Sequence, residues 1–327
     1  MARSKQIADI LHDYRQQAMR FHHEYESRVT SDILVRRYAD RIAELGLEKL
    51  GRAMAGEDTT LLDKRLEELG RRHADRLAWL GIAPYQCPRC EDTGSVNGDY
   101  CVCMRRRIYT EYYGAPDLKQ PGPTLSDYPY GMLDDSKVLP TLGASARELT
   151  RLGVHAFEEM MTAPPGAAIG MLVYGPAGVG KTHLVRAGAH EAALRDLDVL
   201  FLHASDVHNL YLKKRLGGDI NLHYLETSAI LIIDDLGTEP MTNNVTRPSL
   251  NRLLEVRSER RLPTVFTTNL NELQLQYGER ISSRLYDKKV FTFIQLGGVD
   301  LRTGRDYSQQ KDRGQIDSGQ RGNVTIF

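Results

Sequence analysis

Apolar residues near the N-terminus recur in steps of three and four, the period of a helix with one apolar face. The pattern predicts three helices. The first covers residues 5–29, the apolar stripes of the second and third lie at 33–45 and 62–80, and an Ala-Gly-Glu-Asp stretch at 55–58 separates these two helices. Helices with one apolar stripe bury it against a neighbour. The sequence therefore predicts a small α-helical bundle over residues 1–82.

A different pattern begins near residue 145, where helical segments alternate with short, almost wholly apolar runs. The helical segments are 145–161 and 182–194. Strands buried on both faces are apolar throughout, and their alternation with helices indicates a parallel sheet with helices on both faces. We therefore expect an α/β core over residues 145–305. Its strands are expected at 169–174, 198–202, 229–233, 264–267 and 290–294.

Two segments show little periodicity. Residues 113–144 are rich in Pro, Gly, Asp and Tyr, which is typical of a linker. Residues 306–327 are polar up to an apolar end at 324–327 and are expected to form a flexible tail.

Charge is balanced over the 327 residues, with 43 Lys plus Arg and 43 Asp plus Glu. No overall field attracts nucleic acid or a membrane, so any contact with a polyanion must be local. The basic runs 105–107 and 213–215 fit either phosphate contacts or solvated helix faces, and Tyr211 and Tyr224 near the second fit base stacking. No apolar stretch approaches the ~18 to 20 residues of a membrane span, which predicts a cytoplasmic protein without a membrane partner.

The cysteines all fall in one short segment, which we expect to be a module over residues 83–112. A Cys-x-x-Cys pair is followed by a Cys-x-Cys pair, and the residues between them suit a hairpin. Four thiolates complete a tetrahedral structural zinc (Zn²⁺) site. A redox pair and two disulfides are the competing interpretations, and a reducing compartment disfavours the disulfides. The four ligands are Cys87, Cys90, Cys101 and Cys103.

A glycine-rich stretch after the first expected strand fits the phosphate-binding pattern G-x-x-x-x-G-K-[ST]. Backbone N–H groups of such a loop and the following helix N-terminus hold phosphates of ATP; Lys181 adds a charge, and Thr182 would bind Mg²⁺. A chance match in a glycine-rich turn is the alternative, and the flanking strand and helix argue against it. The expected nucleotide-binding residues are Gly175, Pro176, Ala177, Gly178, Val179, Gly180, Lys181, Thr182 and His183.

Two carboxylates end the expected strand at 229–233, as in a Walker B motif. Asp234, next to the phosphate loop, is placed to hold Mg²⁺ through water. A second acid can orient the attacking water, and Asp235 and Glu239 are both candidates. Solvated acids in a turn are the plainer interpretation of either one alone.

Polar and basic residues near the other strand ends add to this site. Asn269 follows the strand at 264–267 and would lie between the acids and the γ-phosphate. Arg280 and Arg284 lie four apart on a short helix, and a guanidinium supplied to a neighbouring subunit neutralises transition-state charge. Arg302, beyond the last strand, is a further candidate for phosphate contact.

The order of these motifs over residues 125–305 resembles the AAA+ ATPases of the DnaC/DnaI replicative helicase loader group. The helical and cysteine-containing segments upstream are similar to the DnaI-type branch. The resemblance implies an AAA+ P-loop core without a lid domain. It also implies the roles of Walker A for Lys181 and Thr182, Walker B for Asp234 and Asp235, sensor 1 for Asn269, arginine finger for Arg284 and sensor 2 for Arg302.

The resemblance further implies partners and activity. The N-terminal region would bind a DnaB-type hexameric helicase, and the core would assemble as a hexameric ring or spiral and contact single-stranded DNA. The expected function is ATP-dependent helicase loading at initiation or restart of replication, with slow ATP hydrolysis stimulated by a partner or DNA. The alternatives are an IstB-type transposition helper ATPase and a scaffold whose nucleotide site is only structural.

Overall fold

The computed structural model describes residues 6–140, 142–164, 166–167, 169–269 and 273–306. The chain divides into two compact units, Met1–Ile108 and Tyr109–Phe327, and each is described by itself. The tail expected from residue 306, including its apolar end at 324–327, lies beyond the described residues except for Asp306.

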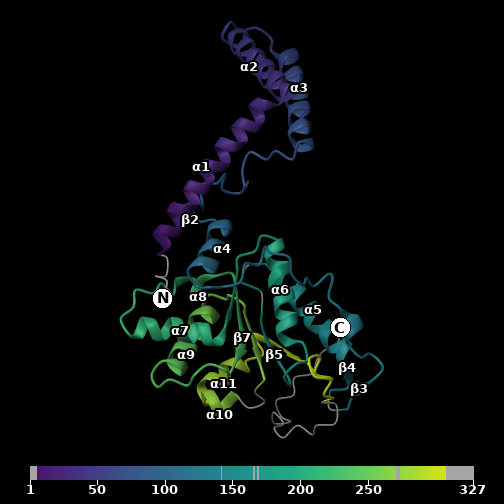
Figure 1. Ribbon diagram of the computed structural model, residues 1–327, viewed down its shortest axis with the longest axis vertical. Helices are drawn as coiled ribbons and strands as arrows, with labels where there is room; N and C mark the ends of the chain where they lie inside the picture. Colours follow the sequence, from purple (N-terminus) through teal and green to yellow (C-terminus); the bar gives the residue numbers. More distant parts are fainter. Residues whose placement is uncertain (1–5, 141, 165, 168, 270–272, 307–327) are drawn as a thin grey trace. The chain divides into compact units, whose positions relative to one another are not determined.

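The first unit begins with the three predicted helices, α1 (Ile7–Ser31), α2 (Ile33–Met54) and α3 (Thr60–Trp79). Asp32 separates α1 from α2, and its side chain accepts hydrogen bonds from the first backbone N–H groups of α2. The same carboxylate pairs with Arg76 of α3 at 2.6 Å. One residue thus both starts α2 and joins it to α3, against which α2 packs (Figure 1).

Much apolar surface of these helices is left uncovered. Helix α1 shares its contacts between α2 and the cysteine segment, where Tyr14 meets the thiols of Cys90 and Cys103. The hairpin of α2 and α3 carries large apolar side chains that are more than half exposed. These are Ile33, Leu47, Leu50, Met54, Leu61 and Trp79.

The cysteine segment contains the predicted hairpin, with β1 (Ser95–Val96) antiparallel to β2 (Asp99–Tyr100). Asn97 and Gly98 connect the strands, both with positive φ, which suits an Asn-Gly turn. Helix α4 (Val102–Glu111) follows, and the boundary between the two units falls inside it.

The arginines at 105–107 are half-buried in the first turns of α4. Arg105 donates to the carbonyl oxygen of Tyr100 at 3.0 Å, and Arg107 donates to Oε1 of Gln17 at 2.8 Å. Two of the three side chains thus bind other parts of their own unit, and contact of this run with phosphates stays a prediction.

The second unit is built on the predicted parallel sheet. Its spatial order is β6-β7-β8-β5-β9, so β8 lies between β5 and β7. All four neighbouring pairs in this sheet are parallel. The strands are β5 (Gly170–Tyr174), β6 (Val199–His203), β7 (Ile230–Leu236), β8 (Thr264–Thr268) and β9 (Phe291–Gln295).

Helices cover both faces of this sheet, as the sequence predicts (Figure 1). Alternate strand residues such as Met171 and Val173 join one core cluster with Phe157 of α5 and Leu184 of α6. Helices α7 and α9 lie on the opposite side. The helices of this unit are α5 (Ala146–Thr162), α6 (Lys181–Leu194), α7 (Ala204–Arg215), α8 (His223–Thr227), α9 (Thr246–Glu259), α10 (Leu273–Tyr277) and α11 (Glu279–Leu285).

Residues 113–144 belong to the second unit rather than lying between two units. They include the short elements η1 (Tyr130–Met132) and β3 (Val138–Leu139), which pairs with β4 (Ala144–Ser145). The segment predicted as a linker therefore helps to build the core around the sheet. Its side chains buried in that core are Leu118, Leu125, Tyr128, Leu133 and Leu139.

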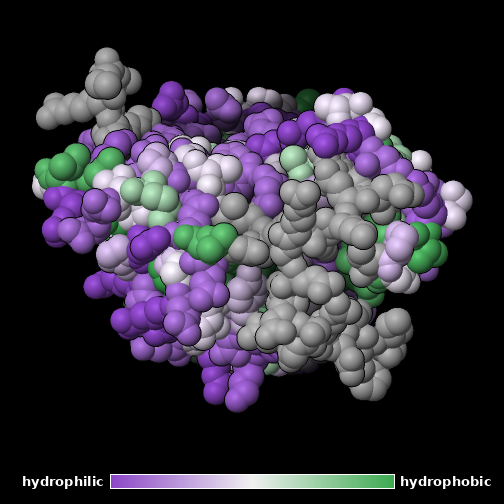
Figure 2. Space-filling view, turned by 90° about the horizontal axis from the view of Figure 1, so that it is seen from below, coloured by the Kyte–Doolittle hydropathy of each residue, from purple (hydrophilic) through white to green (hydrophobic). Residues whose placement is uncertain are grey.

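The surface in Figure 2 is mainly hydrophilic, with hydrophobic side chains in small, separate groups. Of the helices in the described part of the chain, none combines the length and the apolar character that crossing a bilayer requires. After β9, the described residues 296–306 form turns and one isolated bridge, with no helix among them.

Candidate functional site

The phosphate loop connects the carboxyl end of β5 to the first turn of α6. A Cβ atom on Gly175 would lie 2.1 Å from the carbonyl oxygen of Leu296, and one on Gly178 would lie 2.0 Å from Oδ1 of Asp300. Both glycines have positive φ, 145° and 78°. Only glycine allows the segment after β9 to pack this closely against the loop.

Lys181 is only 5 % exposed. Its Nζ donates to the carbonyl oxygens of Gly175 at 2.9 Å and Pro176 at 2.6 Å. Burial lowers the pKa of Lys181 to about 8, although the charges of Asp235 and Asp234 act against this shift. A desolvated cation at the N-terminus of a helix is a strong partner for a phosphate group.

Asp234 lies at the centre of the site and is fully buried. Its Oδ1 accepts hydrogen bonds from the hydroxyls of Thr182 at 3.2 Å and Thr267 at 2.6 Å. Its Oδ2 has no hydrogen-bond partner in the described part of the chain. A buried carboxylate oxygen without a partner, beside a hydroxyl, offers the oxygen ligands that Mg²⁺ prefers. The residues at this position therefore fit the expected magnesium ion.

Asp235 and Glu239 have different surroundings. Asp235 is half-buried with its carboxylate close to Asp234, and its pKa is raised by burial and then by that neighbouring charge. Glu239 is buried, and its two oxygens accept from the Tyr277 hydroxyl at 2.5 Å and the Gly237 N–H at 2.9 Å. Asp235 is thus the acid placed beside Asp234.

His203 belongs to the same group, although the sequence analysis did not select it. Its Nδ1 lies 3.5 Å from Oδ2 of Asp234, and His203, Asp234 and Asp235 bring their ligand atoms within 4.8 Å of one another. His203 ends β6 and is paired in register with Asp234 of β7. The sequence offered one indication of its role, since His203 directly follows an expected strand. That it lies beside Asp234 follows only from the pairing of β6 with β7.

Asn269 and Arg302 lie on the segments that follow β8 and β9. Asn269 is exposed directly after β8, the strand between β5 and β7, and its place beside the γ-phosphate stays a prediction. The segment before Arg302 contacts the loop, because Leu301 N–H donates to the carbonyl oxygen of Gly178 at 3.0 Å. The charge of Arg302 adds to the lowering of the Lys181 pKa and acts against the raising of the Asp235 pKa.

Arg284 pairs within its own unit. Its guanidinium donates to Oε1 of Glu255 on α9 at 2.6 Å, and Arg280 donates to the same oxygen at 3.0 Å. The side chain of Arg284 is 36 % exposed. Its contribution to a neighbour's phosphate site remains a prediction.

The basic run at 213–215 is exposed at the C-terminal end of α7. Lys214 lines an open cavity of about 730 Å³, together with Arg252. The two tyrosines proposed to stack on bases, Tyr211 and Tyr224, are only 8 % and 5 % exposed. Their rings are part of the core, so that part of the prediction is wrong.

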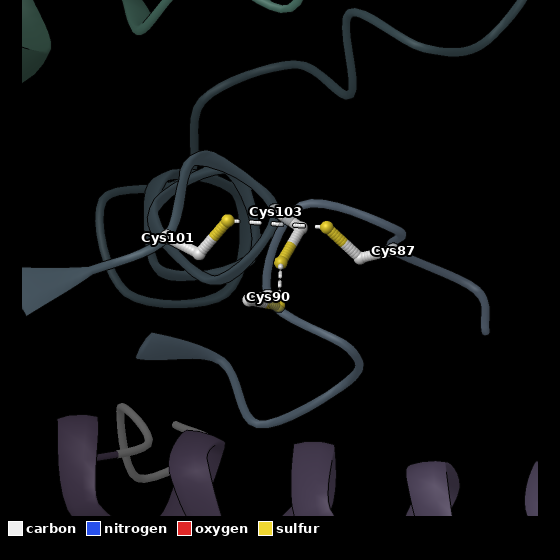
Figure 3. A group of neighbouring side chains, drawn as sticks. All are labelled: Cys87, Cys90, Cys101 and Cys103. Carbon is white, nitrogen blue, oxygen red and sulfur yellow. Dashed lines mark hydrogen bonds between the residues drawn. The ribbon is translucent and has the colours of Figure 1, made fainter. Parts of the chain in front are cut away.

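The four cysteines converge as predicted (Figure 3). Their sulfur atoms lie within 4.8 Å of one another, with 3.9 Å between Cys87 and Cys101 and 3.6 Å between Cys90 and Cys103. No disulfide joins these four thiols. Tetrahedral Zn–S bonds of about 2.3 Å separate sulfur atoms by about 3.8 Å. The cluster therefore fits a zinc ion.

Together, the parallel sheet, the phosphate loop between β5 and α6, and the acids at the end of β7 define a P-loop nucleotide-binding domain. Residues 142–281 match the family model described as "IstB-like ATP binding protein". The replicative helicase loader DnaI of Bacillus subtilis (strain 168) is 28 % identical over 123 residues, which are 36 % of this chain and 39 % of that protein. The second unit thus contains a domain that is similar to the IstB-like ATP-binding proteins.

Two solved structures are also similar to the chain. The crystal structure of DnaI shares 26 % identity and covers 57 % of this chain and 93 % of its own, with a TM-score of 0.41. The crystal structure of the DnaC helicase loader shares 22 % identity and covers 53 % of this chain and 96 % of its own, also with a TM-score of 0.41.

Proposed function

We propose that this protein is an ATP-hydrolysing loader that binds a DnaB-type replicative helicase hexamer and places it on single-stranded DNA. The observation that carries the proposal is the 28 % identity with the DnaI loader over 123 residues, in a chain whose phosphate loop and neighbouring acid form one site. The helicase partner, the DNA and self-assembly into a ring or spiral are parts of this proposal. Binding of the helicase is assigned to the first unit, which exposes a broad apolar surface on α2 and α3.

The proposed chemistry follows from the site. Lys181 binds the β- and γ-phosphates, while Thr182 and Asp234 hold Mg²⁺, which neutralises charge on the phosphate oxygens. Asp235 orients the attacking water, and Asn269 and Arg302 contact the γ-phosphate.

Assembly completes the site in this scheme. Arg284 of one subunit leaves Glu255 and stabilises the transition state in the site of the next subunit. Each active site is then shared between two subunits, so that hydrolysis depends on assembly.

We further propose that Cys87, Cys90, Cys101 and Cys103 hold a structural zinc ion. Four sulfur ligands leave no open position for chemistry, and a segment with two-residue strands has little core of its own. We expect purified protein to contain one zinc ion per chain. Cys87→Ser should lower the zinc content, as measured by elemental analysis, while nucleotide binding by the second unit is retained.

The loader proposal is tested with the full chain, the replicative helicase of the same organism and circular single-stranded DNA. With ATP, the chain should increase the amount of helicase that co-migrates with the DNA, and Lys181→Ala should abolish this increase because it removes the phosphate partner. Failure of the wild-type chain to bind the helicase would overturn the proposal.

A transposition helper ATPase is a second candidate, favoured by the family model that matches residues 142–281. In that case the chain should bind a transposase encoded nearby and leave the helicase unbound. A purely structural nucleotide site is the third candidate. It predicts nucleotide binding without any turnover, even when helicase and single-stranded DNA are present.

A further inference from the structure

One face of helix α1 lies against the cysteine segment. Ile10, Tyr14 and Gln17 are spaced by four and three residues and so share a helix face. Ile10 is completely buried, and Gln17 accepts a hydrogen bond from Arg107 of α4 at 2.8 Å. This end of α1, the purple ribbon in Figure 3, is therefore packed against the module that contains the thiols.

Tyr14, in the middle of this face, reaches the sulfur atoms themselves. Its hydroxyl lies 3.2 Å from Sγ of Cys103 and 3.8 Å from Sγ of Cys90. A Cβ atom on Gly94 would lie 3.2 Å from the Tyr14 ring, so a glycine at this turn leaves room for the ring. A phenol has an ordinary pKa of about 10, so it carries its proton at neutral pH and can donate a hydrogen bond.

We infer that Tyr14 is a positioning residue for the zinc site, whose hydroxyl donates to the metal-bound thiolate of Cys103, with Cys90 as a weaker acceptor, and so fixes helix α1 to the metal. The inference rests on the proposed zinc site. Four thiolates around one Zn²⁺ leave two units of net negative charge, which hydrogen-bond donors stabilise. Because the donor comes from a helix far from the cysteines in sequence, metal occupancy and the position of α1 are coupled.

Helix α1 makes a second contact with the cysteine segment, which strengthens this coupling. His22, two turns beyond Tyr14, lies 3.5 Å from Oδ2 of Asp92. Asp92 is only 5 % exposed, and its carboxylate accepts from the backbone N–H groups of Gln86 and Cys87. Helix α1 thus also contacts the residue that shapes the chain around the first zinc ligand. Loss of zinc would therefore weaken the contact of Tyr14 with the thiols and the contact of His22 with Asp92.

Tyr14→Phe is the direct test, because it removes the hydroxyl and keeps the ring that packs beside Gly94. The full chain would be loaded with zinc, and the zinc dissociation constant would be measured by competition with a chromophoric chelator. Cobalt would then replace zinc, and its thiolate-to-metal charge-transfer band would be recorded. Tyr25→Phe on the same helix is the matched control, and Gln17→Ala weakens the helix contact without touching sulfur.

We expect Tyr14→Phe to raise the zinc dissociation constant about tenfold and to shift the charge-transfer band. Tyr25→Phe should do neither, and Gln17→Ala should leave the band unchanged. Hydrogen exchange in residues 7–20 should increase when zinc is removed from the wild-type chain. A Tyr14→Phe protein with the affinity and spectrum of the Tyr25→Phe control would overturn the inference while leaving the zinc site intact. A wild-type chain that binds no zinc would instead overturn the zinc site, and the inference with it.

Discussion

Lys181 combines burial with two nearby carboxylates, which gives nucleotide binding a specific pH dependence. Its pKa of about 8 is lowered from the ordinary lysine value, and bound phosphate must raise it again because the phosphate is an anion. Binding therefore takes up a proton when the pH exceeds about 8. The contribution of the lysine charge is complete below that pH and is lost as the pH rises toward the pKa of the bound state.

We expect affinity for a non-hydrolysable ATP analogue to be constant from pH 7 to 8. It should then fall, by up to tenfold per pH unit, between pH 8 and 9.5. Calorimetry at pH 8.5 in two buffers of different ionisation enthalpy should detect the proton uptake. A flat affinity over this range would show that the lysine stays charged in the free protein.

Conservative substitutions can distinguish the roles of Asp235 and Glu239. Asp235→Asn should reduce ATP turnover by at least about 100-fold with little change in nucleotide affinity, because the residue acts on water rather than on the nucleotide. Glu239→Gln should change turnover only a few-fold, since both of its oxygens already bind Tyr277 and Gly237. Steady-state ATPase rates, measured with helicase and DNA present, decide which acid orients the attacking water. A larger loss of turnover in Glu239→Gln than in Asp235→Asn would assign this role to Glu239.

The sequence alone predicts most residues of this site, but it predicts only part of their arrangement in space. Glycine, lysine and threonine at fixed spacing predict a phosphate loop, because each performs a local task in it. The choice between Asp235 and Glu239, and the approach of His203, depend on strand register and on contacts with distant residues. Such contacts leave no local pattern in a sequence.

At the scale of elements, the close approach of α5 and α6 depends on a small residue. A Cβ atom on Gly188 of α6 would lie 2.5 Å from the ring of Phe157, which is 1 % exposed. Gly188→Ala should lower the free energy of unfolding of the second unit by about 1–3 kcal/mol, the usual effect of overpacking. Urea unfolding of the full chain, followed through nucleotide binding, would measure it.

Gly70→Ala is the matched control. Gly70 lies inside helix α3, and a Cβ atom there would meet nothing within 4 Å. Because alanine favours the helix over glycine, this change should be neutral or stabilise the first unit by about 0.5–1 kcal/mol. Equal destabilisation by both changes would contradict the packing explanation.

The elements themselves were largely predictable, with helix and strand limits within a few residues, because helical and strand periods are properties of local sequence. The segment 113–144 was not. Its apolar residues occupy separate places in the core along an irregular path, so they show no period that would distinguish them from a linker. The burial of Tyr211 and Tyr224 could not be predicted either, because it depends on elements that are far away in the chain.

At the scale of the whole molecule, the proposed sharing of the active site between two subunits predicts complementation. Lys181→Ala should lack nucleotide binding, and Arg284→Ala should bind nucleotide but lose turnover. A mixture of the two should recover part of the wild-type ATPase rate, because an intact loop can then meet an intact arginine from a neighbour. The mixture is compared with each variant alone at the same total concentration. A mixture no more active than its components would show that each chain completes its own site.

The burial of residues 113–144 also determines where the two units can be separated. The hydroxyl of Tyr109 donates to Oδ1 of Asp198 at 2.7 Å in the interior, so the second unit already begins within helix α4. A fragment starting at residue 145 would lack the buried apolar side chains of residues 113–144 and leave cavities in their place. When N-terminal regions are exchanged between related proteins, helix α4 and everything after it should therefore stay with the second unit. Changes of partner would then arise from the residues before that helix.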